Sequence, residues 1–129
     1  MNRENSRSPR VLIVEDEGLI RWAVATTLDA AGASVVEASD AEAAIAALHA
    51  ESGGFDVAVL DVRLPDANGL SLLAVMRRRW PAVRVLVMTA FGNDEVHGCA
   101  RALGALRVVD KPFDLAVMRD LVFEAAAAG

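Results

Sequence analysis

Four short apolar runs of this sequence each end at side chains that can take part in chemistry. These side chains are Glu15 and Asp16, Asp61, Thr89, and Lys111. Apolar runs of four to eight residues between turn signals are typical of strands buried on both faces. Functional groups collect at the carboxyl ends of the strands in an open parallel sheet, so we expect the five side chains to lie together. Asp61 would then be a reactive carboxylate at a strand end.

A divalent cation is the expected companion of three crowded carboxylates. Carboxylates at short range repel one another, which raises a pKa unless a cation intervenes. The three carboxylates, the Lys111 ammonium and one divalent ion sum formally to zero charge. Mg²⁺ prefers carboxylate, water and phosphate oxygens, Mn²⁺ accepts the same ligands, and the sequence has no Cys/His cluster for zinc. A carboxylate beside Mg²⁺ can accept a phosphoryl group as an aspartyl phosphate.

Strands and helices must alternate to bring these side chains to one edge of a sheet. Apolar runs predict five strands near residues 11–14, 35–36, 57–60, 83–88 and 106–109. Helical periodicity fills the intervals, with starts expected from the Ser39–Glu42 spacing, Asn68, Asp94 and Asp114, and ends from Gly32 and Gly104. This alternation predicts an α/β fold, in which five helices cover both faces of a five-stranded parallel sheet.

The composition indicates one domain with an aliphatic core. The chain has 129 residues, of which 54% are hydrophobic and only 5% aromatic, and such a core suits helices packed on a parallel sheet. We expect a disordered polar lead-in at residues 1–9, a folded domain at 10–125 and a frayed end at 126–129.

Charge and hydropathy argue against several classes of function. The formal net charge of −5 opposes nucleic-acid binding by this domain and leaves Arg77-Arg78-Arg79 as a solvated helix end. No apolar run approaches the ~18–20 residues of a membrane span, and no secretory segment opens the chain. The single cysteine, Cys99, cannot form an internal disulfide. We therefore expect a cytoplasmic protein without membrane contact.

Four motifs, in order along the chain, resemble the receiver domain of two-component response regulators over residues 10–125. They are Val14-Glu15-Asp16, the run 60–69 from Leu60-Asp61 to Asn68-Gly69, Thr89-Ala90, and Asp110-Lys111-Pro112-Phe113. With Ile20-Arg21-Trp22, they look most like receivers of the nitrogen-regulator type. The resemblance implies a flavodoxin-like, doubly wound sheet with strand order 2-1-3-4-5.

The resemblance also implies a metal site and an acceptor. Asp61 would be the phosphoacceptor and Asp16 a direct Mg²⁺ ligand. Glu15 would hold a metal-bound water, and the backbone carbonyl of Arg63 would be a further ligand. The phosphoryl donor would be a histidine kinase or a phosphotransfer protein. The phosphorylated domain would signal to an effector domain or a partner protein.

Other residues would handle the phosphoryl group by the same resemblance. Thr89 would hydrogen-bond the phosphoryl group and move toward it, while Lys111 would pair with it. Ala90 is small and would leave an approach to the aspartate, and the bond before Pro112 would be cis. A homodimer is possible. Arg107 stands where receivers that dimerise through their last strand often have an acid, so that particular dimer is less expected.

Three positions depart from the family pattern or tune it. Val108 stands where receivers usually have a Tyr or Phe whose ring swings inward when the threonine moves, so the usual transmission is in question. Arg63 and Phe91 each lie two residues beyond a key residue, where the family tunes hydrolysis of the acyl phosphate. A long cation and a ring could shield the phosphoryl group from water, and we predict a long-lived phosphorylated state.

Two other classes of function stay open. An aspartate-nucleophile phosphatase is disfavoured because such enzymes use an acid two residues after the nucleophile, where this chain has Arg63. A pseudo-receiver, an interaction module with a vestigial pocket, is disfavoured by the intact site, although Val108 leaves it some room.

A few single residues carry weaker expectations. We expect Asp66 to cap the helix that follows it and Trp22 to be a partly exposed aromatic, with a kinase-docking role as the sharper alternative. His49 and His97 are too isolated in the sequence to be predicted as metal ligands.

Overall fold

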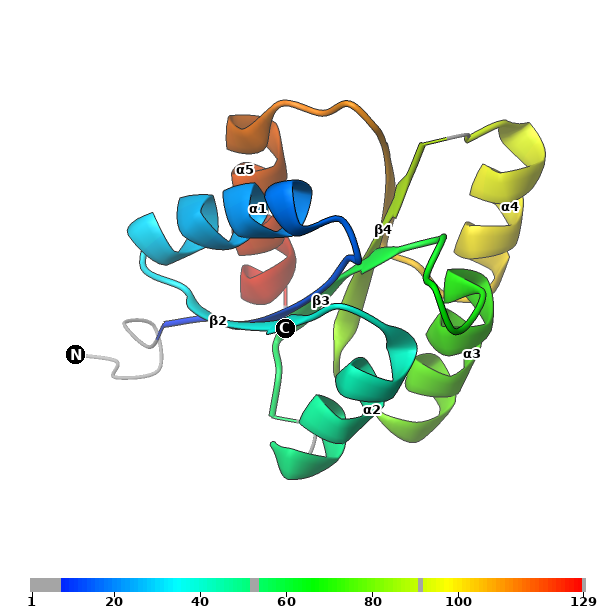
Figure 1. Cartoon of the computed structure of the whole chain (residues 1–129), viewed down its shortest axis with the longest axis horizontal. Coiled ribbons are helices and arrows are strands. Elements are labelled where there is room, and N and C mark those ends of the chain that lie inside the picture. The colour runs from blue at the N-terminus through cyan, green and yellow to red at the C-terminus, as the bar shows by residue number, and fades with distance from the viewer. Residues whose placement is uncertain (1–7, 52–53, 91, 129) are drawn as a thin grey trace.

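The computed structural model describes residues 8–51, 54–90 and 92–128, in which strands and helices alternate along the chain (Figure 1). The elements are β1 Arg10–Val14, α1 Gly18–Ala30, β2 Ser34–Ala38, α2 Ala41–Ala50, β3 Val57–Asp61, α3 Gly69–Arg79, β4 Arg84–Thr89, α4 Asp94–Ala102, β5 Arg107–Asp110 and α5 Leu115–Ala127. Within these residues, none of the helices combines the length and apolar character needed to cross a bilayer.

The five strands form one parallel sheet in the order β2-β1-β3-β4-β5. This confirms the predicted parallel sheet and the order that the resemblance implied. The register pairs Val14 with Leu60, so the carboxyl ends of β1 and β3 are level. Thr89 pairs with Asp110 at the corresponding end of β4 and β5. The side chains that follow β1, β3, β4 and β5 therefore share one edge of the sheet.

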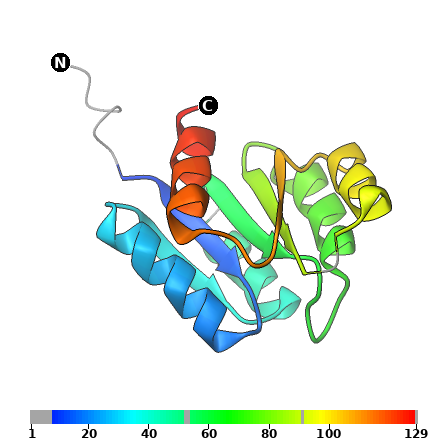
Figure 2. The same cartoon turned by 90° about the horizontal axis from the view of Figure 1, so that it is seen from above.

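Helices cover both faces of the sheet, and each face has its own core. Helices α1 and α5 lie on one face, and α2, α3 and α4 lie on the other (Figures 1 and 2). Alternate residues of a strand enter different cores: Leu12 packs in the cluster with α2 and α3, and Ile13 in the cluster with α1 and α5. All residues of β3 are buried. Burial on both faces explains why these strands are uninterrupted apolar runs in the sequence.

Two helices begin one residue away from the predicted cap. The N-cap of α2 is Asp40, whose carboxylate accepts the N–H of Ala43 at 2.7 Å, and not Ser39. The N-cap of α4 is Asn93, and Asp94 is already helical. The cap is the extended residue directly before the first turn, and in both places two neighbouring residues had suitable side chains. The helix starts predicted at Asn68 and Asp114 are confirmed, and both residues are N-caps.

The helix ends are set by glycine and by packing. Gly32 and Gly104 follow α1 and α4 with φ of 104°, a left-handed conformation that favours glycine. Helix α5 continues to Ala127 and so includes residues 126 and 127, where a frayed end was expected. Ala125 is buried and Ala126 packs against the same core, and these contacts stabilise the last turn.

Candidate functional site

The structure brings all five predicted side chains together at the carboxyl edge of the sheet. They line a hollow of about 430 Å³ together with Ala90 and the loop that follows β3. The lining includes Glu15, Asp16, Asp61, Arg63, Thr89 and Lys111. Asp61 lies between the strand that supplies the acid pair and the strand that supplies the hydroxyl, because β3 lies between β1 and β4.

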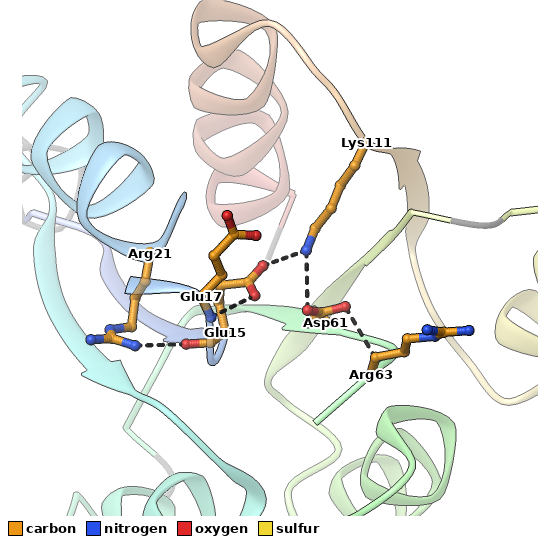
Figure 3. Close-up of polar contacts among 6 residues, drawn as sticks. All are labelled: Glu15, Glu17, Arg21, Asp61, Arg63 and Lys111. Atoms are coloured by element: carbon orange, nitrogen blue, oxygen red, sulfur yellow. Dashed lines mark hydrogen bonds and ion pairs between the residues drawn. The ribbon is translucent and has the colours of Figure 1, made fainter. Parts of the chain in front are cut away.

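Asp61 is held by two hydrogen bonds from different elements (Figure 3). The residue is 5% exposed. Its Oδ1 accepts the backbone N–H of Arg63 at 3.1 Å, and its Oδ2 accepts from the Lys111 ammonium at 3.1 Å. The loop after β3 returns close to the backbone of Asp61 at Gly69, whose N–H donates to the Val62 carbonyl at 2.7 Å. The carboxylate is thereby oriented from its own loop and from the end of β5.

Glu15 is the most deeply buried carboxylate of the site, with 1% of its surface exposed. Its Oε1 accepts from Lys111 at 2.6 Å, and its Oε2 accepts the backbone N–H of Glu17 at 3.1 Å. Burial raises the pKa of Glu15 to about 7, and the neighbouring Asp61 adds to the rise, whereas the Lys111 bond opposes it. Burial also lowers the pKa of Lys111, but its bonds to Glu15 and Asp61 outweigh burial and leave that pKa raised. Lys111 therefore stays charged between two carboxylates.

The acid cluster suits a hard divalent cation. Glu15, Asp16 and Asp61 can each offer a carboxylate oxygen, and these oxygens lie within 4.8 Å of one another. Glu15 and Asp61 are buried, whereas Asp16 is exposed, and all three line the hollow. Oxygen ligands of this kind are those that Mg²⁺ and Mn²⁺ prefer. Lys111 neutralises one of the three carboxylates, so the formal charge that remains matches one divalent ion.

Thr89 and the residues after it form the other wall of the hollow. Thr89 is 3% exposed at the end of β4, and its carbonyl accepts the N–H of Lys111 at 2.8 Å. Ala90 also lines the hollow, with no side chain beyond Cβ. The peptide bond between Lys111 and Pro112 is cis, as the resemblance implied. Phe91 lies outside the described residues, so its predicted tuning role stays a prediction.

The structure places three residues that depart from the family pattern or tune it, Val108, Arg107 and Arg63. Val108 is half-buried on β5 and packs against the core under α2, α3 and α4, so a branched aliphatic group fills this place. Arg107 is exposed and pairs with Glu124 of α5 at 3.2 Å. Arg63 is exposed, and its guanidinium points away from Asp61 (Figure 3). In this conformation, Arg63 meets the acceptor through its backbone N–H.

Asp66 has a different role from the predicted one. Its carboxylate accepts the N–H groups of Ala41 at 2.9 Å and Glu42 at 3.0 Å, so it caps α2 and not the following helix α3. These two backbone hydrogen bonds lower the pKa of Asp66. Local spacing could not reveal this contact, because the loop after β3 reaches a helix 24 to 25 residues earlier in the chain.

Three further contacts near the site, two polar and one steric, are not evident from the sequence. His97 of α4 lies 2.8 Å from the Asp110 carboxylate at the end of β5, whereas the sequence suggested an isolated histidine. A Cβ atom added at Gly92 would lie 2.3 Å from the Asp110 carboxylate and 2.8 Å from the Thr89 methyl group, so a larger residue there would require these side chains to shift. Arg21 of α1 donates to the backbone carbonyl of Glu15. Each contact joins elements that the sequence does not show to be neighbours.

A five-stranded doubly wound sheet, with an acid pair, an aspartate, a hydroxyl and a lysine at its carboxyl edge, defines the receiver class of signalling domains. Residues 11–123 match the family model of the response regulator receiver domain. The chain therefore belongs to the response regulator receiver domain family.

Individual relatives agree with this assignment. The chain is 37% identical over 113 residues to the response regulator protein FleR of Pseudomonas aeruginosa, covering 88% of this chain and 24% of FleR. It is 32% identical over 105 residues to the DNA-binding transcriptional regulator NtrC of Salmonella typhimurium, covering 81% of this chain and 22% of NtrC. The predicted similarity to nitrogen-regulator receivers is thus confirmed. The chain spans about a quarter of the length of these two relatives.

A solved structure supports the fold. The receiver domain of the Francisella response regulator 1452 superposes with a TM-score of 0.87 at 23% identity, covering 94% of this chain and 98% of that one.

Proposed function

We propose that this domain is a cytoplasmic receiver that accepts a phosphoryl group on Asp61 from a histidine kinase or a phosphotransfer protein, in a reaction that requires Mg²⁺ or Mn²⁺. The observation that carries the proposal is the pair of contacts from Lys111 to Glu15 and Asp61, at 2.6 and 3.1 Å, in a hollow lined by Thr89. The half-buried lysine between two carboxylates places one cation on a flexible stem beside the acceptor.

The residues of this chain prepare Asp61 as a nucleophile. One Asp61 oxygen attacks phosphorus, the new O–P bond replaces the N–P bond of the donor histidine, and the released imidazole takes a proton from solvent. The Arg63 N–H and the Lys111 ammonium hold the carboxylate on different oxygens and fix its direction. When bound, Mg²⁺ supplies positive charge for the phosphoryl oxygens. Glu15, Asp16, Asp61 and the carbonyl of Arg63 would hold it.

The phosphoryl group then changes the charges that the site must satisfy. A phosphoryl group brings about −1.5 to −2 charge and acceptor oxygens. Lys111 would exchange its present carboxylate contacts for the phosphoryl group, and the Thr89 hydroxyl would donate to it. Thr89 ends β4, and Lys111 directly follows β5, the edge strand that pairs with β4. A local charge change can thereby shift the population of a two-state surface that a partner recognises.

The donor and the output belong to other molecules or other segments. On α1, beside the site, Leu19 is 72% exposed and Trp22 is 60% exposed, and we propose this apolar pair as part of the docking surface for the phosphoryl donor. The matched region covers only 24% of FleR and 22% of NtrC, and NtrC is named as a DNA-binding regulator. We propose that this domain controls an effector domain or a partner protein, without itself binding nucleic acid.

The residues of the site argue against the two alternative functions. In a phosphatase, the position two residues after the nucleophile would carry a general acid, but Arg63 occupies it and points away from Asp61. We therefore propose a phosphoacceptor and not an enzyme with turnover. A pseudo-receiver would lack reactivity, and only Val108 favours that function.

Incubation with acetyl phosphate and Mg²⁺, followed by intact mass measurement, tests the proposal. We expect the mass to increase by one phosphoryl group in wild type and in Asp120→Asn, a matched exposed control on α5. The increase should be lost in Asp61→Asn and without divalent ions. Repeated release of phosphate would support the phosphatase, and no reaction in wild type would support the pseudo-receiver.

A further inference from the structure

The guanidinium of Arg21, on α1, bridges the acid turn and the neighbouring edge strand. Its Nη1 donates to the backbone carbonyl of Glu15 at 2.9 Å, and its Nε donates to Glu37 Oε1 on β2 at 3.1 Å. Its side chain is 24% exposed. Figure 3 shows that Arg21 approaches Glu15 from the side opposite to Lys111. Arg21 therefore contacts the backbone of the turn and not the carboxylates inside the hollow.

The carbonyl that Arg21 holds sets the position of Asp16. The Glu15 carbonyl and the Asp16 Cα lie in one planar peptide group, so fixing the oxygen fixes the direction in which Asp16 leaves the strand. The N–H of Glu15 is already held by the Ala38 carbonyl at 3.0 Å. Asp16 is exposed, so burial in the core does not fix its orientation. Its place in the acid cluster depends on the backbone that carries it.

We propose that Arg21 is a positioning residue for the divalent-ion site, acting through the Glu15–Asp16 peptide. This inference rests on the proposed function. Arginine suits the role because its planar fork reaches two acceptors at once, whereas lysine carries a point charge on a flexible stem. Residues that orient metal ligands typically change affinity by about 10- to 100-fold when they are removed.

The sign of the effect separates positioning from simple charge. Arg21 is a cation beside an acid cluster, so its removal should strengthen the binding of a divalent cation if only Coulomb energy mattered. Loss of positioning should weaken binding instead. The two explanations therefore predict opposite changes in the Mg²⁺ dissociation constant.

Titration calorimetry with Mg²⁺ on the unphosphorylated protein tests the inference. We expect Arg21→Met to bind Mg²⁺ about tenfold more weakly. Arg21→Lys keeps the charge and one donor, and should lie between Arg21→Met and wild type. Arg119→Met is the matched control, because it removes an equal charge from the exposed face of α5 and should not weaken binding.

Amide exchange and the Mg²⁺ dependence of phosphorylation test the same variants independently. In metal-free protein, the amide of Glu17, which bonds Glu15 Oε2, should exchange with solvent faster in Arg21→Met than in wild type. With acetyl phosphate, the Mg²⁺ concentration for half-maximal phosphorylation should rise about tenfold, while the rate at saturating Mg²⁺ changes by less than about twofold.

The possible outcomes separate this inference from the proposed function. Mg²⁺ binding by Arg21→Met that equals or exceeds that of wild type would overturn the positioning role and leave the receiver function intact. If Arg21→Met does not fold, Arg21→Lys decides, because its charge is unchanged and unaltered binding would refute positioning. A wild-type protein that binds no Mg²⁺ and takes no phosphoryl group would overturn both.

Discussion

The close approach of Gly69 to the backbone of Asp61 gives a sharp prediction about how the acceptor is held. A Cβ atom at position 69 would lie 2.1 Å from the Asp61 carbonyl oxygen and 2.7 Å from the Val62 Cα, whereas ordinary contacts begin near 3.4 Å. Both groups are backbone at the end of a fully buried strand, so neither can rotate away. For Gly69→Ala, the backbone at Asp61 or at the start of α3 must move by more than 1 Å.

The cost of this movement follows from the packing. Overpacking of a well-packed interior costs about 1–3 kcal/mol, and we expect the upper end, about 3 kcal/mol, because the clash is with backbone. Urea unfolding, followed by the fluorescence of Trp22 and Trp80, measures the loss of unfolding free energy. Since a domain of this size has about 5–15 kcal/mol of stability, the variant should still fold, with slower phosphorylation of its displaced Asp61.

A second glycine serves as the matched control. Gly98 lies inside α4, and a Cβ atom there would meet nothing within 4 Å. Gly98→Ala should therefore stabilise the protein by about 0.5–1 kcal/mol through helix propensity alone. A loss below about 1 kcal/mol in Gly69→Ala would refute the reasoning, because the loop after β3 would then be free to shift without cost.

Three further predictions concern charge, lifetime and metal. The pKa of Asp66 is lowered from 3.8 by its bonds to α2, so its carboxylate stabilises the fold above pH 3.8 and loses that effect as pH falls through the folded pKa. The difference in unfolding free energy between wild type and Asp66→Asn should thus be present at neutral pH and should disappear as the pH falls below 3.8. A difference that does not change with pH would contradict this prediction. We predict that the phosphorylated protein has a half-life longer than seconds and that Arg63→Ala shortens it, as measured by the loss of label from the phosphorylated domain. A half-life of seconds that Arg63→Ala lengthens would refute this. Mg²⁺ at about 100 times its dissociation constant should add about 2.7 kcal/mol to the unfolding free energy of wild type and of Glu17→Gln, but not of Asp16→Asn; equal stabilisation of all three in urea unfolding would contradict a ligand role for Asp16.

Much of the fold follows from local pattern. The run from Val57 to Leu60 is apolar without interruption because β3 is buried on both faces, and its burial is visible in the sequence for that reason. Gly32 and Gly104 mark helix ends because a left-handed residue is needed there. The caps at α2 and α4 were misplaced by one residue, because two adjacent side chains could serve and only the backbone conformation selects one.

The residues of the site were also visible one at a time. Glu15, Asp61, Thr89 and Lys111 each follow an apolar run, and a parallel sheet must collect such strand ends at one edge. The order of the strands came from the resemblance and not from spacing, because no local pattern specifies which parallel strands are neighbours.

The sequence by itself determined that reactive groups stand at the strand ends, because burial leaves a periodic apolar signature and polar residues interrupt it. Only the tertiary structure decided which groups touch. Lys111 bridges Glu15 and Asp61 across sequence separations of 96 and 50 residues. Arg21 holds the acid turn and β2 together, and Asp66 caps a helix that precedes it. Contacts of this kind depend on how the elements pack, so no window of the sequence contains them.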